Sequence, residues 1–240
     1  MKGSERHRLK ENELTQALSG ATERFQQNRS TINLVAGVIV AVVLIGGGYW
    51  AWKTRSDTRA QTLLGDALVV MQTPIQEPKP GVTPPAGSYP TIQARTEAAL
   101  AKFTEVFNAY PSTTAGIAAR YYAAGALATL GRHAEAATRY QEVVDHAGRN
   151  SFYGRVGQLG VVEANAQAKR YDQAITAAQV LVNNTGDETI PRDALLMQLG
   201  RVQAAAGKKT EAKQTLDKVI ADFPDSPYVE EAKKMLAELT

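Results

Sequence analysis

The chain has 240 residues, of which 44% are hydrophobic and 21% are charged, and it contains no cysteine. The absence of cysteine excludes disulfides, thiolate metal sites and a cysteine nucleophile. The net charge of +3 divides into +2 over residues 1–30 (six basic, four acidic) and +1 over residues 53–240 (21 basic, 20 acidic), so neither part carries the basic excess of a nucleic-acid-binding domain.

Residues 1–30 are predicted to form an arm with a short amphipathic helix. Apolar residues recur there at spacings of four, three and four, which places them on one helical face. They are Leu14, Leu18, Ala21 and Phe25. Two interpretations stay open. The helix lies on the lipid surface, or it docks to a cytoplasmic partner or to a second copy of the chain.

The stretch from Ile32 to Trp52 is long and apolar enough to span a bilayer. Asn33 is the only strongly polar residue among its 21 residues. A helix of that length extends about 30 Å, the thickness of the hydrocarbon core, and the aromatic residues at its C-terminal end suit the headgroup level. The run is longer than the apolar core of a secretory signal peptide. We therefore predict a transmembrane helix over residues 31–53, in preference to a cleaved signal or a buried core helix.

The orientation of this span follows from the charge on either side of it. Six lysine and arginine residues precede the span, and three follow it within twenty residues. Short positively charged segments stay in the cytoplasm, whereas long domains are translocated largely regardless of charge. We therefore expect a cytoplasmic N-terminus and an exported C-terminal domain.

The segment after the span is predicted to contain a helix and then a loop. Ser56 or Asp57 can cap a helix that ends near Gln72. Residues 73–92 hold six of the ten prolines in the chain. Proline lacks an amide hydrogen and fixes its φ angle, so this segment is predicted to be a loop. We interpret it as a solvated insertion, and a proline-motif ligand is the alternative.

From residue 94 onward the sequence repeats four times. An alanine recurs at spacings of 37, 38 and 38, and a proline or glycine follows each one twelve residues later. The alanines are Ala99, Ala136, Ala174 and Ala212, and the residues that follow them are Pro111, Gly148, Gly186 and Pro224. Apolar residues four and seven positions after each alanine complete one face of a helix. Self-similarity at this period predicts a helical solenoid.

The last repeat resembles the tetratricopeptide repeat (TPR). The residues that carry the resemblance are Leu196, Leu199 and Gly200, the turn residue Gly207, and then Ala212, Leu216 and Pro224. They follow the TPR pattern of L-G in the first helix, A-x₃-F in the second and a closing proline, although Gln203 stands where the pattern has tyrosine. The resemblance covers residues 95–240 and implies an all-α domain of antiparallel helix pairs, which we predict to extend over residues 54–240.

The first helix of the middle repeat and the end of the chain depart from the regular repeat pattern. In the middle repeat, Leu159 and Gly160 lie two residues early relative to Ala174, so the register of that helix stays open. A final helix is predicted after Pro224, with Asp225 or Ser226 as its cap and a polar outer face that ends the solenoid.

The order of the parts gives a second resemblance. A short charged arm, one span ending in aromatic residues and an alanine-rich degenerate TPR domain are similar to the bacterial family of the ancillary Sec-translocon subunit. This resemblance implies a single-pass protein of the bacterial inner membrane whose C-terminal domain lies in the periplasm.

No catalytic or cofactor motif occurs in the sequence. His7, His133 and His146 are the only histidines, and they have no partners at the spacing of a metal site or a catalytic triad. His133 is expected to be exposed to solvent. No phosphate-binding loop occurs. We therefore expect no enzyme activity, no cofactor and no metal.

In TPR folds, the first helix of each pair lines a concave groove. The resemblance therefore implies partner-binding positions on three first helices. These positions are Tyr121 and Gly125, Leu159 and Glu163, and Met197 and Arg201. Methionine adapts its shape and tyrosine is amphipathic, which suits a peptide-binding groove. The alternative is that these side chains pack against the neighbouring repeat.

Two functions are compatible with these features. The first is a membrane-anchored scaffold that binds a translocon component, a chaperone or a newly exported chain in the groove. The second is a structural protein of the envelope, which links the inner membrane to outer-membrane or cell-division assemblies by forming homo-oligomers. Both use other proteins and the lipid bilayer as partners.

Overall fold

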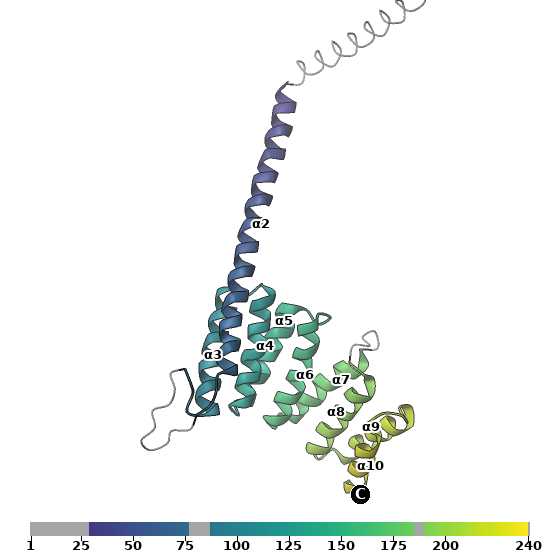
Figure 1. Ribbon diagram of the computed structural model, residues 1–240. Coiled ribbons are helices and arrows are strands. Elements are labelled where there is room, and N and C mark those ends of the chain that lie inside the picture. Colours follow the sequence, from purple (N-terminus) through teal and green to yellow (C-terminus); the bar gives the residue numbers. More distant parts are fainter. Residues whose placement is uncertain (1–28, 77–86, 185–189, 240) are drawn as a thin grey trace, which may run out of the picture. The chain divides into compact units, whose positions relative to one another are not determined.

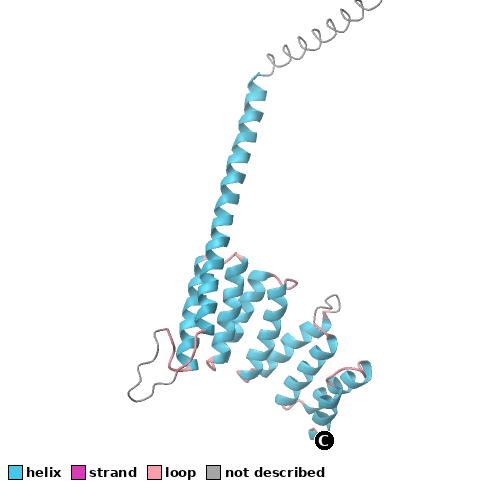
Figure 2. Cartoon of the chain, viewed as in Figure 1, coloured by secondary structure: helices cyan, strands magenta, loops and turns pink. Residues whose placement is uncertain are grey.

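The computed structural model describes residues 29–76, 87–184 and 190–239, and every regular element in these ranges is a helix (Figure 2). The helices are α2 (Arg29–Gln72), α3 (Ile92–Ala109), α4 (Thr114–Thr129), α5 (His133–Ala147), α6 (Phe152–Gln167), α7 (Tyr171–Asn183), α8 (Arg192–Ala205), α9 (Lys209–Asp222) and α10 (Val229–Glu238). The all-α prediction is confirmed for the described residues. The predicted amphipathic helix of the N-terminal arm lies outside them.

The chain divides into two compact units, Met1–Arg55 and Ser56–Thr240. Helix α2 continues from the first unit into the second without interruption. The prediction that Ser56 or Asp57 caps a separate helix is therefore wrong. No proline or glycine lies between Trp52 and Leu64 to end the helix, and the Thr54 hydroxyl donates to the Trp50 carbonyl at 2.9 Å, a bond that a helix accommodates.

The apolar part of α2 is exposed. Within Asn33–Gln72 the helix contains one stretch that is long and apolar enough to cross a membrane, and none of that stretch is buried. Leu44, Ile45 and Trp50 expose 69%, 72% and 69% of their surface. Side chains of this kind are unfavourable in water and favourable in lipid, so this surface is the one that a spanning helix would present to a bilayer.

In the Ser56–Thr240 unit, helices that follow one another in the sequence pack as antiparallel neighbours (Figure 1). The last turns of α2 share a core with α3 and α4. The pairs α4–α5, α6–α7 and α8–α9 follow, and α10 packs against α9. The predicted solenoid of helix pairs is confirmed.

The recurring alanines lie in the interior of the unit, between packed helices. Ala99, Ala136, Ala174 and Ala212 are all completely buried. Seven residues after each alanine lies a buried Val106, Val143, Leu181 or Val219. The repeated apolar face of the second helices is therefore the core face, and any larger side chain at the alanine positions would meet a neighbouring helix.

Within each complete pair, the turn between the two helices has the same backbone conformation. Gly131, Lys169 and Gly207 all have positive φ angles, of 74°, 59° and 73°. They lie 38 residues apart, which is the period of the repeat. The next residue closes each first helix through its amide hydrogen, as in the bond from Arg132 to the Leu127 carbonyl at 2.9 Å.

The register of the middle repeat is set by Tyr140 on the preceding helix. A Cβ atom added at Gly160 would lie 2.5 Å from the Tyr140 ring, whereas one added at Gly200 would lie 2.8 Å from Leu216 in its own pair. Gly160 is therefore not the counterpart of Gly200. The residue twelve positions before Ala174 is Val162, which is completely buried.

The two ends of the proline-rich segment are held together. The Gln76 amide donates to the Tyr89 carbonyl at 2.9 Å, and the Tyr89 amide donates to the Pro74 carbonyl at 3.1 Å. The Thr91 hydroxyl then caps α3 by accepting from the Ala94 amide at 3.0 Å. Residues 73–76 and 87–91 are non-helical, as predicted, whereas Ile92, the last residue of the predicted loop, already belongs to α3. Residues 77–86 lie outside the described residues.

The terminal helix α10 begins later than predicted. Its first residue is Val229, and neither Asp225 nor Ser226 caps it. The Ser226 hydroxyl instead donates to the Asp193 carboxylate of α8 at 2.5 Å and accepts from the Tyr228 amide at 3.2 Å. The turn before α10 is thereby attached to α8.

Candidate partner-binding surface

The predicted binding residues come from the first helices of three consecutive pairs. Tyr121 lies on α4, Leu159 and Glu163 lie on α6, and Arg201 lies on α8. All four side chains are partly or fully exposed. We refer to the surface formed by Tyr121, Leu159, Glu163 and Arg201 as the first-helix face.

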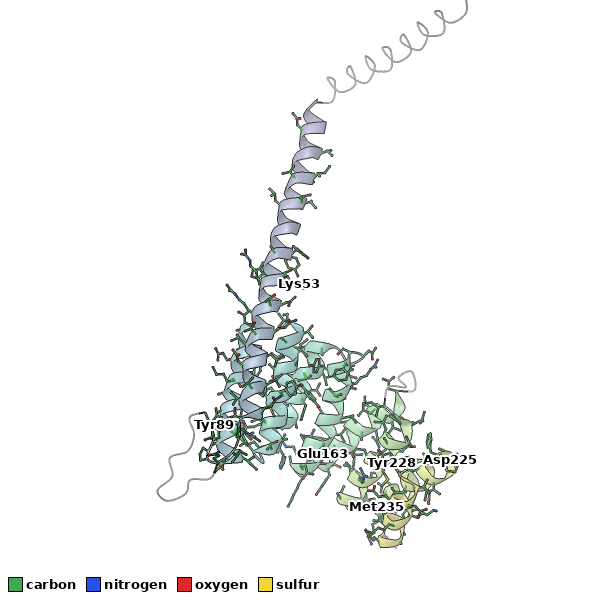
Figure 3. The ribbon with its side chains drawn as sticks, viewed as in Figure 1. Lys53, Tyr89, Glu163, Asp225, Tyr228 and Met235 are labelled. Carbon is green, nitrogen blue, oxygen red and sulfur yellow. The ribbon has the colours of Figure 1, made fainter. Side chains whose placement is uncertain are left out.

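Contacts between neighbouring first helices make this face continuous. The Tyr121 ring lies 5.9 Å from the ring of Tyr153 at the start of α6. Glu163 accepts one hydrogen bond from Gln198 on α8 at 3.0 Å and another from Gln167 at 2.8 Å. Glu163 is exposed, and Figure 3 shows its place on the middle helices of the unit. Its carboxylate retains lone pairs that can accept from a partner.

Met197 does not belong to this face. Its side chain is completely buried, in the core that α6, α7, α8 and α9 share. This corrects the expectation that Met197 faces the groove. The physical reason is that α8 is packed against α7 and α9, and Met197 belongs to the buried cluster that they form. The packing alternative therefore holds for this residue.

Arg201 is already engaged within the chain. Its Nε and Nη2 atoms donate to the two carboxylate oxygens of Glu231 on α10, at 2.9 and 2.6 Å. These hydrogen bonds raise the pKa of Arg201 and lower the pKa of Glu231. A partner at this end of the face would therefore meet an ion pair and not a free cation.

Tyrosines dominate the other end of the face. The Tyr121 ring contacts Tyr122, Tyr140 and Tyr153 at centroid distances of 5.8, 5.6 and 5.9 Å. Burial, with a smaller contribution from Tyr121, raises the pKa of Tyr140 to about 12, and burial likewise raises the pKa of Tyr121. Both phenols are therefore neutral at physiological pH and offer apolar ring surface with a polar edge.

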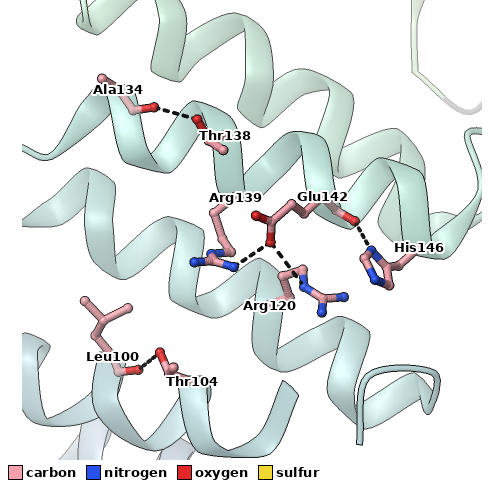
Figure 4. Close-up of polar contacts among 8 residues, drawn as sticks. All are labelled: Leu100, Thr104, Arg120, Ala134, Thr138, Arg139, Glu142 and His146. Atoms are coloured by element: carbon pink, nitrogen blue, oxygen red, sulfur yellow. Dashed lines mark hydrogen bonds and ion pairs between the residues drawn. The ribbon is translucent and has the colours of Figure 1, made fainter. Parts of the chain in front are cut away.

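A buried arginine that the sequence did not indicate joins three helices (Figure 4). Arg120 on α4 is 5% exposed, and its Nε lies 3.5 Å from the Glu142 carboxylate on α5. The guanidinium carbons of Arg120 and Arg139 lie 5.0 and 4.8 Å from the centre of the Phe107 ring on α3. Burial lowers the pKa of Arg120, and Glu142 opposes this shift. The cluster fastens α3, α4 and α5 together.

A cavity of this unit is lined by residues other than those of the predicted groove. It has a volume of about 730 Å³ and is formed by α5, α6 and α7, between the second helices of two adjacent pairs. None of the predicted binding residues lines it. Sequence reasoning missed it because no motif marks it, although polar residues such as Gln141, Asp145 and Thr176 recur along the two flanking helices.

The described residues contain no group of three or more histidine, aspartate or glutamate side chains that could hold a metal ion. His133 is half-buried and its Nδ1 atom is buried without a hydrogen-bond partner among the described residues. The expectation that His133 is exposed to solvent is therefore wrong. The ring lies in the first turn of α5, where the helix packs back against its pair.

Comparisons with known proteins bear on the fold. Residues 193–226 match the family model described as tetratricopeptide repeat. No curated protein matches the chain. The crystal structure of TPR-like repeats from a Podosopora anserina protein described as a kinesin light chain is similar to 76% of this chain and 86% of its own, with a TM-score of 0.55 and 16% identity. A single-residue variant of that protein gives the same TM-score and identity over 85% of its chain. At this identity the likeness shows the TPR-like fold alone.

Proposed function

We propose that this protein is a membrane-anchored scaffold that binds another protein through the first-helix face. The apolar stretch of α2 from Ile32 to Trp52 supplies the anchor, and the TPR-like unit supplies the binding surface. TPR-like solenoids generally bind proteins.

The observation that carries this proposal is that α4 and α6, which contact one another, expose three kinds of side chain. Tyr121 offers a partly exposed aromatic ring, Leu159 a partly exposed apolar side chain, and Glu163 an exposed carboxylate. Aromatic and apolar anchors surrounded by polar groups are the chemistry of protein–protein interfaces. An amphipathic helix or an extended peptide suits such a surface.

The proposed setting is the bacterial inner membrane, with a cytoplasmic N-terminus and the Ser56–Thr240 unit in the periplasm. The proposed partner is a translocon component, a chaperone or a newly exported chain. The six basic residues before the span, against three after it, support this orientation. The resemblance to the ancillary Sec-translocon subunit family supports the class of partner.

A reporter fusion tests the orientation. Alkaline phosphatase fused after Thr240 should be active, because it folds only after export, whereas a reporter that works only in the cytoplasm should be inactive there. The reverse pattern would reject the proposed topology.

Site-specific crosslinking in cells tests the binding face. A photoreactive amino acid at Leu159 should capture a heterologous partner, and Glu163→Lys should reduce the yield. Asp217→Lys is the matched control, because Asp217 is an exposed acid on α9, away from the face. Equal yields in both variants would reject the face, and exclusive capture of a second copy of the chain would favour the structural envelope function.

A further inference from the structure

The cavity between α5, α6 and α7 is bounded by one stripe of side chains from each helix. On α6 the stripe is Gln158, Val161 and Asn165, at spacings of three and four, so one face of this helix forms the floor. α5 and α7 both run antiparallel to α6 and form the two walls. The cavity therefore has the form of a trough that runs along α6.

Five of the 16 residues that line this trough are apolar. Val144 and Val161 are buried, Ala177 is half-buried, and Val180 on α7 is 45% exposed. Val180 is thus an apolar side chain that lines the cavity and is exposed to water. A ligand bound in the cavity would bury it, which is favourable. A volume of about 730 Å³ also lies within the range of ligand-binding pockets.

The charges that line the trough are unevenly satisfied. Glu142 interacts with Arg139 and Arg120, and Asp172 accepts from Lys208 at 2.7 Å. In contrast, the guanidinium groups of Arg149 and Arg170 have neither an ion pair nor a hydrogen bond within the described ranges. Asp145, the fifth charged residue of the lining, accepts a hydrogen bond from the Gln141 side-chain amide at 2.9 Å. The two charged side chains at the cavity without such a contact within the described ranges are therefore both arginines.

The two arginines stand at opposite ends of the trough. Arg149 precedes α6 and Arg170 follows it, and the 16 residues of α6 span about 24 Å. Because each arginine side chain can reach inward, carboxylates about three helical turns apart, roughly 16 Å, would meet both of them.

We propose that this trough is a second docking site, distinct from the first-helix face, and that its occupant is an amphipathic helix with acidic residues near both ends. The apolar side of this helix lies between α5 and α7 against Val161 and Val180, and its terminal carboxylates pair with Arg149 and Arg170. Two faces would allow the scaffold to hold two proteins at once.

A spin-label experiment tests this inference on the full chain in nanodiscs of zwitterionic lipid. Because the chain contains no cysteine, Thr176→Cys provides a single labelling site at the cavity. The probes are two synthetic helical peptides of about four turns. They share a leucine face, and one carries glutamates near both ends where its twin carries lysines. Empty nanodiscs report binding to lipid.

The acidic peptide should immobilise the label at a concentration at least tenfold lower than its basic twin. Arg149→Glu with Arg170→Glu should weaken this binding at least tenfold, whereas Arg192→Glu, an exposed arginine outside the cavity, should leave it unchanged. Val180→Asp should weaken binding of the acidic peptide as well, and circular dichroism verifies that each variant is folded.

Three results would overturn the proposal. The two peptides could bind equally, the arginine variants could bind as the parent does, or Glu163→Lys could abolish binding that the arginine variants retain. The last result would place the peptide on the first-helix face. None of these outcomes bears on partner capture at Leu159, so the two proposals fail separately.

Discussion

Arg201 on α8 and Glu231 on α10 form a two-bonded ion pair, with N···O distances of 2.9 and 2.6 Å. The guanidinium carbon of Arg201 also lies 5.9 Å from the centre of the Tyr228 ring. The terminal helix is thus attached to one end of the first-helix face. A substitution of Arg201 changes both the charge of that face and the attachment of α10.

Arg201→Ala should lower the free energy of unfolding by less than about 1 kcal/mol. The side chains of Arg201 and Glu231 are 41% and 44% exposed, and exposed ion pairs contribute little because water screens them. A double-mutant cycle with Glu231→Ala, measured by urea unfolding in detergent micelles, gives the coupling energy. A coupling of several kcal/mol would show that the pair is a buried network instead.

The contribution of the Arg201–Glu231 pair to folding stability should decrease in acid. Arg201 lowers the pKa of Glu231 below its ordinary value of 4.5, so the folded state releases this proton more readily than the unfolded state. The contribution to stability is therefore complete above pH 4.5 and is lost as the pH falls through the lowered pKa. The stability difference between the parent and Glu231→Gln should accordingly shrink in acid. A difference independent of pH would contradict this assignment.

Met197→Ala should destabilise the fold by about 2–5 kcal/mol, the usual cost of emptying a fully buried site. Met197 is completely buried, so lost binding in this variant would report damage to the core. Gln198→Ala is the matched control on the same helix, because Gln198 is partly exposed and should change stability much less. Thermal denaturation separates the two variants. Similar melting of both would contradict the position of Met197 in the core.

Gly160→Ala should destabilise the fold by about 1–3 kcal/mol, because the added methyl group would overlap the Tyr140 ring. The structure leaves 2.5 Å between that Cβ and the ring. Gly65 in α2 is the control, since a Cβ there has no atom within 4 Å and alanine favours the helix by up to about 1 kcal/mol. The two substitutions should shift the urea midpoint in opposite directions. A shift in the same direction would contradict the contact.

The solenoid could be predicted from sequence because its periodic contacts admit few residue types. Ala99, Ala136, Ala174 and Ala212 are completely buried, and only a small side chain fits where helices cross. The register of the middle repeat could not be predicted from Gly160. Gly160 packs against the ring of Tyr140, which lies 20 residues earlier in the preceding repeat. A contact between two repeats cannot be recognised from the local sequence pattern of one of them.

The surfaces were predicted less well than the core. The positions of Tyr121, Leu159 and Glu163 follow from helical spacing, but the burial of Met197 depends on how far α8 rotates towards α9. The cavity depends on the separation of α5 and α7, which their own sequences do not determine. The uninterrupted α2 was missed because serine and aspartate favour helix starts, a preference that a continuing helix overrides.

Alkaline pH should reveal the environment of Tyr140. Its pKa is raised from 10.0 to about 12 by burial, so the folded state holds this proton more tightly than the unfolded state does. This contribution to stability is complete below pH 10 and is lost as the pH rises towards 12. Tyr140→Phe should abolish that part of the alkaline loss and change stability little at neutral pH. An unchanged alkaline transition in Tyr140→Phe would contradict the assignment.

Lys169→Gly should stabilise the protein by about 0.5–1 kcal/mol. Among the described residues, Lys169 is the one non-glycine residue with a positive φ angle, 59°. The equivalent turns of the flanking pairs use Gly131 and Gly207. A side chain in this conformation brings its Cβ close to the following carbonyl, and glycine avoids that cost, although it gives the unfolded chain more freedom.

Lys218→Gly is the matched control, because Lys218 lies exposed within α9, where the same exchange should destabilise by about 1 kcal/mol. Urea unfolding of the two variants should therefore show opposite shifts, and a loss of stability in Lys169→Gly would show that the lysine side chain itself holds this turn.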